Sequence, residues 1–187
     1  DSSPHTDSSP TSMYARQGGG ARQPIAFIGD PPLRRPDEAV VGRRPVVAIM
    51  DSGCGYHPWL EPVVRTDVSL DQAIIGASDP FTDPEVHGDQ MGPLDGVLDK
   101  NAGHGTFIAG LVFQACPDAD ILSWRVVPAE GPILEVDWIP PLAQVVELVR
   151  RHQAGEPGGH PVDILTLSLG YYHETPEDAL TDPIVGA

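Results

Sequence analysis

The sequence is poor in positive charge and has almost no lysine. Only 11 of its 187 residues are basic while 27 are acidic, which gives a formal net charge of −16, and Lys100 is the only lysine. So acidic a chain repels phosphate backbones and anionic lipid surfaces. We therefore expect no nucleic-acid partner and no electrostatic attachment to a membrane.

Cysteines and long apolar runs are also scarce. The two cysteines, Cys54 and Cys116, do not make a disulfide framework. A helix expected between them would hold them too far apart to pair. Cys54 is expected to be a small buried thiol rather than a nucleophile. No apolar run approaches the roughly 20 residues that span a bilayer, so no membrane span is expected. A signal peptide is either absent or already removed.

Apolar residues nevertheless make up 40% of the chain, enough for a sizeable core. Residues 1–24 have the Ser, Pro and Gly content of a flexible tail, and residues 25–187 are expected to form the domain. Within it, residues 25–45 are expected to wrap the outside as extended chain. Residues 61–100 are acidic and irregular, and so long a loop is usually functional or mobile.

Hydrophobic patterning predicts alternating strands and helices in the rest of the chain. The expected strands are 46–50, 119–127 and 162–170, and the third is expected to be buried. The expected helices are 106–114 and 136–155, the latter interrupted early by Pro140 and Pro141, and a further helix is expected near Pro176. This βαβαβ order predicts an α/β fold with a parallel sheet and right-handed crossovers. In such sheets, the chemistry lies at the carboxyl ends of the strands.

Two residue types at these positions suit proton transfer. Asp51 directly follows the first strand, and His104 lies where the Gly-flanked loop of "NAGHGTFIAG" enters a helix. A buried carboxylate would accept a hydrogen bond from one imidazole nitrogen, leaving the other nitrogen free to take a proton from a nucleophile. Either residue alone is more often a turn, cap or loop residue.

Three segments in order resemble signatures of the subtilisin-like serine peptidases. They are "VVAIMDSGCGYHP" with D-S-G at 51–53, "NAGHGTFIAGLV" with H-G-T at 104–106, and "DILTLSLG" with S-L-G at 168–170. The resemblance covers roughly residues 45–175. It implies a subtilisin-like fold, with a parallel sheet in a three-layer α/β/α arrangement, that is incomplete in this chain.

The resemblance also implies roles for individual residues. Asp51 would orient the catalytic histidine, and His104 would be the general base and then the general acid of an Asp-His-Ser triad. Ser168, Leu169 and Gly170 would form one wall of the cleft, pairing with an extended peptide or protein substrate by strand addition. By looser analogy, residues 131–133 would form the opposite wall.

The nucleophile of that family has no counterpart in the sequence. No G-T-S occurs, and Ser12 in "PTSMYA" lacks the flanking glycine and proline. Three interpretations follow: the Asp/His-bearing part of a divided peptidase whose second chain carries the Ser and the oxyanion Asn, a truncated or engineered fragment, or a catalytically inactive module that binds peptides or a partner. A stop inside an apparent helix and an exposed sheet edge favour a missing piece. The chain alone is expected to be inactive.

Cofactors and localisation are less constrained. The resemblance implies that catalysis requires no cofactor, although a structural calcium is an alternative to a simply solvated acidic loop. A metal bound by Asp51, His57, His87 and His104 is a further alternative, without any recognised ligand spacing. The aspartates available to calcium are Asp67, Asp71, Asp79, Asp83, Asp89, Asp95 and Asp99.

Secretion is common in the family and implies a secreted or extracellular protein, while the lack of a disulfide framework keeps a cytoplasmic role open.

Overall fold

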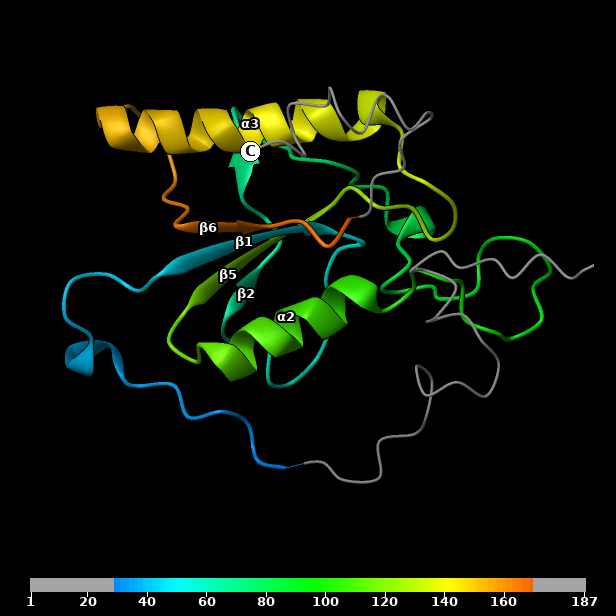
Figure 1. Ribbon diagram of the computed structural model, residues 1–187, viewed down its shortest axis with the longest axis horizontal. Coiled ribbons are helices and arrows are strands. Elements are labelled where there is room, and N and C mark those ends of the chain that lie inside the picture. Colours follow the sequence, from blue (N-terminus) through cyan, green and yellow to red (C-terminus); the bar gives the residue numbers. More distant parts are fainter. Residues whose placement is uncertain (1–28, 170–187) are drawn as a thin grey trace, which may run out of the picture.

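A parallel four-stranded sheet lies at the centre of the protein, with one long helix on each face (Figure 1). The computed structural model describes residues 29–169. The sheet order is β2-β5-β1-β6, and a separate two-stranded hairpin is formed by β3 and β4. The elements are η1 (Asp37–Ala39), β1 (Val46–Asp51), β2 (Val64–Arg65), β3 (Ser69–Leu70), β4 (Ala73–Ile74), η2 (Pro80–Thr82), α2 (His104–Ala115), β5 (Asp120–Arg125), α3 (Glu135–Ala154) and β6 (Ile164–Thr166). The predicted α/β class with a parallel sheet is therefore confirmed.

β1 is the buried centre of this arrangement. All six of its residues are buried, because β5 and β6 flank it and a helix covers each face. Alternate side chains point to opposite faces of a strand. Ala48 and Met50 accordingly pack in the cluster that includes Val145 and Leu148 of α3. Ile49 packs on the other face with Ala109 and Phe113 of α2.

Both elements that carry the expected catalytic pair form where the sequence predicts them. β1 continues one residue beyond the predicted strand and includes Asp51. α2 begins at His104, two residues earlier than predicted, because Gly103 adopts a left-handed conformation (φ 80°) that ends the preceding loop. His104 is thus the first residue of the helix.

Two predictions, on the helix 136–155 and on the segment 61–100, are wrong in detail. Pro140 and Pro141 do not interrupt α3, which runs unbroken from Glu135. The carbonyls that they leave without a donor, four residues earlier, belong to the exposed residues 136 and 137, where water can satisfy them. The segment 61–100 is not wholly irregular, since β2 extends the sheet beside β5.

The third strand is shorter and more exposed than predicted. β6 spans only Ile164–Thr166, and Ile164 is 58% exposed. The reason is its position, because β6 pairs only with β1 among the described residues and so forms an edge of the sheet. The expected helix near Pro176 and the tail 1–24 lie outside the described residues.

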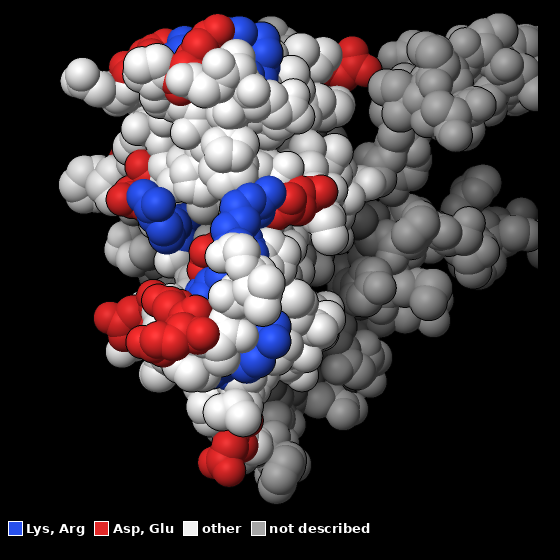
Figure 2. Space-filling view, turned by 90° about the vertical axis from the view of Figure 1, so that its left-hand side faces the viewer, with Lys and Arg blue, Asp and Glu red and all other residues white. Residues whose placement is uncertain are grey.

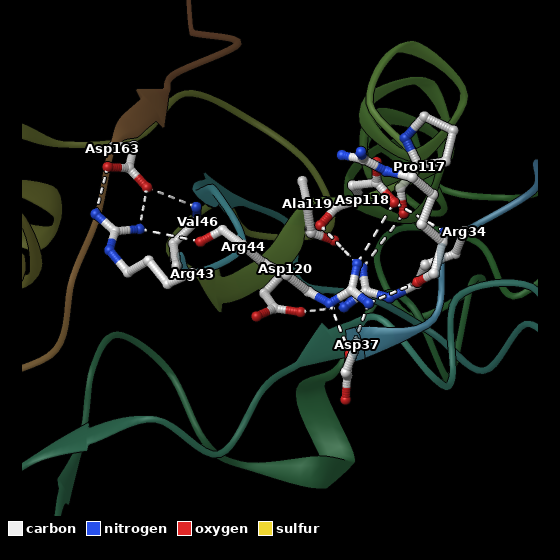
Figure 3. Close-up of polar contacts among 11 residues, drawn as sticks. Arg34, Asp37, Arg43, Arg44, Val46, Pro117, Asp118, Ala119, Asp120 and Asp163 are labelled. Atoms are coloured by element: carbon white, nitrogen blue, oxygen red, sulfur yellow. Dashed lines mark hydrogen bonds and ion pairs between the residues drawn. The ribbon is translucent and has the colours of Figure 1, made fainter. Parts of the chain in front are cut away.

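Arginines fasten residues 34–45, which include the short helix η1, to the strands of the sheet (Figure 3). Arg44 is buried, and it donates to Asp37 (2.6 Å) and to the carbonyl of Arg35 (2.6 Å). Arg34 donates to the carbonyl of Ala119 and pairs with Asp120 at the start of β5. Arg43 makes two 2.6 Å bonds to Asp163, just before β6. In Figure 2, basic and acidic side chains likewise lie next to one another, so that face carries charges of both signs.

Within residues 29–169, we find no helix that is both long and apolar enough to cross a bilayer.

A pair of adjacent valines tests the packing of α3 on the sheet. Val145 is 2% exposed, whereas Val146 is 60% exposed on the same helix. We expect Val145→Ala to lower the free energy of unfolding by about 2 kcal/mol, because two methyl groups leave a close-packed core. Val146→Ala, the matched control, should change it by less than about 0.5 kcal/mol. Urea denaturation measures both, and equal losses would show that α3 does not pack as described.

Candidate active site

The site is built around the carboxylate of Asp51. This side chain ends the central strand β1 and is 0% exposed. Its Oδ1 accepts hydrogen bonds from the backbone N–H of Ser52 (2.7 Å) and lies 2.7 Å from His104 Nδ1. A buried carboxylate is costly unless hydrogen bonds compensate the lost hydration. Donors from the strand end and from α2 therefore hold Asp51 in place through Oδ1, while Oδ2 is buried and has no hydrogen-bond partner among the described residues.

Glycine contacts bring His104 to this position. A Cβ on Gly105 would lie 2.0 Å from the carbonyl oxygen of Gly53, a backbone atom that cannot move aside. Only glycine at position 105 therefore lets the first turn of α2 approach the chain that leaves β1 so closely. Gly53 itself has φ 109°, which favours glycine as well. These two glycines explain why the D-S-G and H-G-T segments meet.

The electrostatics of the pair favour a protonated Nδ1. An ionised carboxylate can only accept, so His104 Nδ1 donates to Asp51. The pKa of His104 is raised, chiefly by this hydrogen bond; burial opposes the shift, and the negative charges of Asp51 and Glu85 add to it. The His104 side chain is 43% exposed, and its Nε2 forms no hydrogen bond to the residues described here. Nε2 is thus free to exchange a proton with a group that approaches from solvent.

A second carboxylate, which sequence reasoning missed, joins the two segments. Glu85 Oε1 lies 2.5 Å from Ser52 Oγ, and Oε2 lies 2.5 Å from Thr106 Oγ1. Ser52 Oγ in turn accepts from the Gly105 N–H at 2.8 Å. Glu85 sits in the irregular acidic loop, where one more acidic residue gives no signal in the sequence. Ser52 and Thr106 lie inside the recognised motifs, but nothing in those motifs indicates a role for them.

Arg125 anchors the loop that carries Glu85. It ends β5, opposite Asp51 in the strand register, and it is 7% exposed. Its guanidinium donates to the carbonyls of Ala77 (3.3 Å) and Asp79 (2.7 Å) and lies 4.0 Å from Asp83 Oδ1. An arginine at the end of an apolar strand is the one sequence feature that could have indicated this anchor.

Cys54 is a poor nucleophile in this environment. Its thiol is partly buried, and burial raises its pKa to about 11, with the charges of Glu85 and Asp83 adding to the shift and a hydrogen bond to Thr106 opposing it. The reactive thiolate is therefore rare at neutral pH. Both cysteines are free, as the sequence predicts.

Ser168, one of the predicted cleft residues, lies at the same carboxyl end of the parallel strands as Asp51. Thr166 of β6 is opposite Ile49, so Ser168 follows two residues beyond this pair, as Asp51 does on β1. Ser168 is exposed and Leu169 is partly buried, while Gly170 lies outside the described residues. Residues 131–133, the expected opposite wall, fall in the connection between β5 and α3, and two of the three are exposed.

The histidines proposed as alternative metal ligands do not gather at the site. His57 is exposed, and its Nδ1 accepts from the backbone N–H of Trp59 at 3.2 Å. His87 is also exposed. In the part of the chain that the structure covers, no three His, Cys, Asp or Glu side chains come together in a way that could hold a metal ion.

Comparisons of the chain with protein-family models, with curated proteins and with solved structures found no match.

Replacing Asp51 with Asn tests the pair directly. Because Asp51 raises the pKa of His104, we expect the Asp51→Asn substitution to lower the pKa of His104. NMR titration of the imidazole measures this pKa. Protonation of His104 stabilises the parent fold below about pH 6.5, the value for an unfolded histidine, and this stability is lost as the pH rises through the raised pKa. Asp51→Asn should flatten that dependence. Asp137→Asn, at an exposed site on α3, is the control. If the pKa of His104 is the same in the two variants, Asp51 does not contact His104 as described.

Cys54 alkylation tests the environment beside the pair. With a pKa of about 11, Cys54 should react with iodoacetamide at pH 8 far more slowly in the folded chain than in the unfolded chain. The thiolate fractions differ by roughly two orders of magnitude. Peptide mass spectrometry separates Cys54 from Cys116. Equal rates before and after unfolding would show that the thiol is neither buried nor shifted.

Proposed function

We propose that the chain is the Asp/His-bearing part of a subtilisin-like serine endopeptidase. The nucleophilic Ser and the oxyanion Asn would lie on a separate or missing C-terminal segment. The observation that carries the proposal is the 2.7 Å contact between buried Asp51 and His104 Nδ1, with no hydrogen bond from Nε2 to any described residue. This is the geometry in which an aspartate orients a histidine as general base. The three motifs in order support it, as does the parallel sheet, whose central strand β1 ends at Asp51 beside the first residue of α2, His104.

The chemistry assigns each residue a step. Asp51 holds the Nδ1–H tautomer of His104, so that Nε2 accepts the proton of a serine hydroxyl as this attacks the peptide carbonyl. The imidazolium that forms is stabilised by the Asp51 carboxylate. His104 then gives the proton to the leaving amine. Without the serine, this chain alone would bind but not cleave.

The exposed chain after β6 suits an extended peptide. Leu167 is 40% exposed, and Ser168 is exposed as well. Backbone groups at such a position can pair with a substrate strand, which gives affinity without dependence on side chains. In this proposal, residues 168–170 form one wall of the substrate cleft.

An apolar surface that no described residue covers favours the existence of a second segment. Between α3 and β6 lies a groove of about 350 Å³ whose walls include Val146, Val149 and Leu165. Beside it, β6 pairs on one side only among residues 29–169, and the side chain of Ile164 is exposed. A further strand and helix from the Ser-bearing segment would cover both surfaces, as parallel sheets are normally covered on both faces.

The acyl-transfer mechanism itself needs no cofactor. A structural calcium in the acidic loop remains a separate proposal, which isothermal titration with calcium would test. We also propose secretion, with a cytoplasmic location as the alternative.

A fluorophosphonate probe tests the proposed function. Applied to the native preparation with everything that co-purifies, the probe should label a serine on a partner or on a longer form of the chain. In a reconstituted enzyme, Asp51→Asn should lower kcat by roughly four orders of magnitude, because the tautomer of His104 is no longer fixed.

The control is His57→Ala, which removes an exposed histidine outside the pair and should retain labelling. If an intact complex takes up no probe, the chain belongs with catalytically inactive modules that bind peptides or a partner. Peptide binding without cleavage would then identify that role.

A further inference from the structure

Glu85 occupies the junction between the end of β1 and the start of α2. Its two carboxylate oxygens reach one hydroxyl from each segment, Ser52 at 2.5 Å and Thr106 at 2.5 Å. Oε1 also lies 3.3 Å from the Gly105 N–H, next to His104. Thr106 Oγ1 accepts from the Gly55 N–H at 2.7 Å, so the same network holds the chain that leaves β1.

The Ser52 hydroxyl has one proton and two carboxylates within reach. Glu85 Oε1 is 2.5 Å from Ser52 Oγ, whereas Asp51 Oδ1 is 3.1 Å away. A hydroxyl donates a single hydrogen bond, and the shorter distance assigns it to Glu85. Asp51 Oδ1 is then left with the Ser52 N–H and His104 as donors. Without Glu85, the hydroxyl proton would turn to Asp51 and compete with His104.

Glu85 is itself held in place through Asp83. Its backbone N–H donates to Asp83 Oδ1 at 2.9 Å. Asp83 lies beside the buried guanidinium of Arg125, which also binds the carbonyls of residues 77 and 79. The loop therefore presents the Glu85 carboxylate from a fixed backbone.

We propose that Glu85 is a positioning residue that takes the Ser52 hydroxyl proton and so keeps this further donor away from Asp51 Oδ1, the oxygen that accepts from His104. Glu85 acts through Ser52 and Asp51 and does not touch a substrate. This role rests on the proposed function only in that His104 is taken to be catalytic. The contacts of Glu85 act on the Asp51–His104 pair whether or not the chain is part of a peptidase. The charged groups that act on His104 are Asp51 from β1 and Glu85 from the loop.

Two substitutions in the full 187-residue chain separate charge from hydrogen bonding. Glu85→Gln removes the charge but keeps an oxygen that can accept from Ser52. Glu85→Leu removes both. In NMR titrations of the imidazole, the His104 pKa should fall in both variants and fall further in Glu85→Leu. Solvent exchange of the His104 Nδ1 proton should be faster by about tenfold in Glu85→Leu, the factor expected when a competing donor weakens one hydrogen bond.

Ser52→Ala makes the test specific. With the hydroxyl gone, nothing is left to compete for Asp51, so adding Glu85→Leu should change Nδ1 proton exchange far less than it does in the parent. Glu61→Gln, an exposed residue after β1, is the control, and the amide spectrum of each variant verifies the fold. An equal effect of Glu85→Leu in the presence and absence of Ser52, or equal shifts for Gln and Leu, would overturn the proposal.

The outcome is independent of the probe experiment. If the Glu85 variants behave as expected and no serine is labelled, the positioning role stands and the peptidase proposal fails. If a serine is labelled and Glu85→Leu leaves His104 unchanged, the peptidase stands and Glu85 has no positioning role. In a reconstituted enzyme, Glu85→Leu should lower kcat by about tenfold with KM unchanged, the signature of a group that acts on the reacting residue rather than on binding.

Discussion

A carboxylate buried at the end of the central strand is the constraint on which the rest of the site depends. Asp51 is fully enclosed, so its charge must be met by donors that the fold supplies. The Ser52 N–H comes from the strand itself, and His104 comes from the start of α2. Bringing that helix close enough requires Gly105 to lie against Gly53 with no room for a side chain. The position of one charge thus explains the glycines, the start of the helix and the tautomer of the histidine.

The acidic loop serves the same site. A buried arginine, Arg125, fastens residues 77–83 to the end of β5, and two residues further on Glu85 binds the hydroxyls on either side of the pair. One of the many acidic residues of the chain therefore has a local use here, since the Glu85 carboxylate lies next to the Asp51–His104 pair. A long loop with little regular structure is held by specific contacts to strand ends.

The sequence indicates the parts of the site that depend on local patterns. An apolar run that ends in Asp51 predicts a buried strand, and a Gly-flanked His104 before an apolar segment predicts a helix start; both hold. Glu85 could not be foreseen, and only the place of Arg125 at the end of an apolar strand gives any indication, because both roles arise from contacts between segments distant in sequence. The continuity of α3 through Pro140 also depends on solvent exposure that the sequence pattern does not give. The carbonyl that Pro140 leaves without a donor belongs to the exposed residue 136. The exposure of β6 follows from its place at the sheet edge, which periodicity does not reveal.

The start of α2 at His104 has one more consequence. The first residue of a helix lies at the positive end of the aligned peptide dipoles, a location that disfavours a second positive charge. An imidazolium there would be opposed by its own helix if Asp51 and Glu85 did not supply negative charge on the other side. Because the pKa of His104 is raised on balance, the two carboxylates outweigh the helix end and favour the imidazolium. A histidine that is helped to hold the proton it accepts suits the role of a general base.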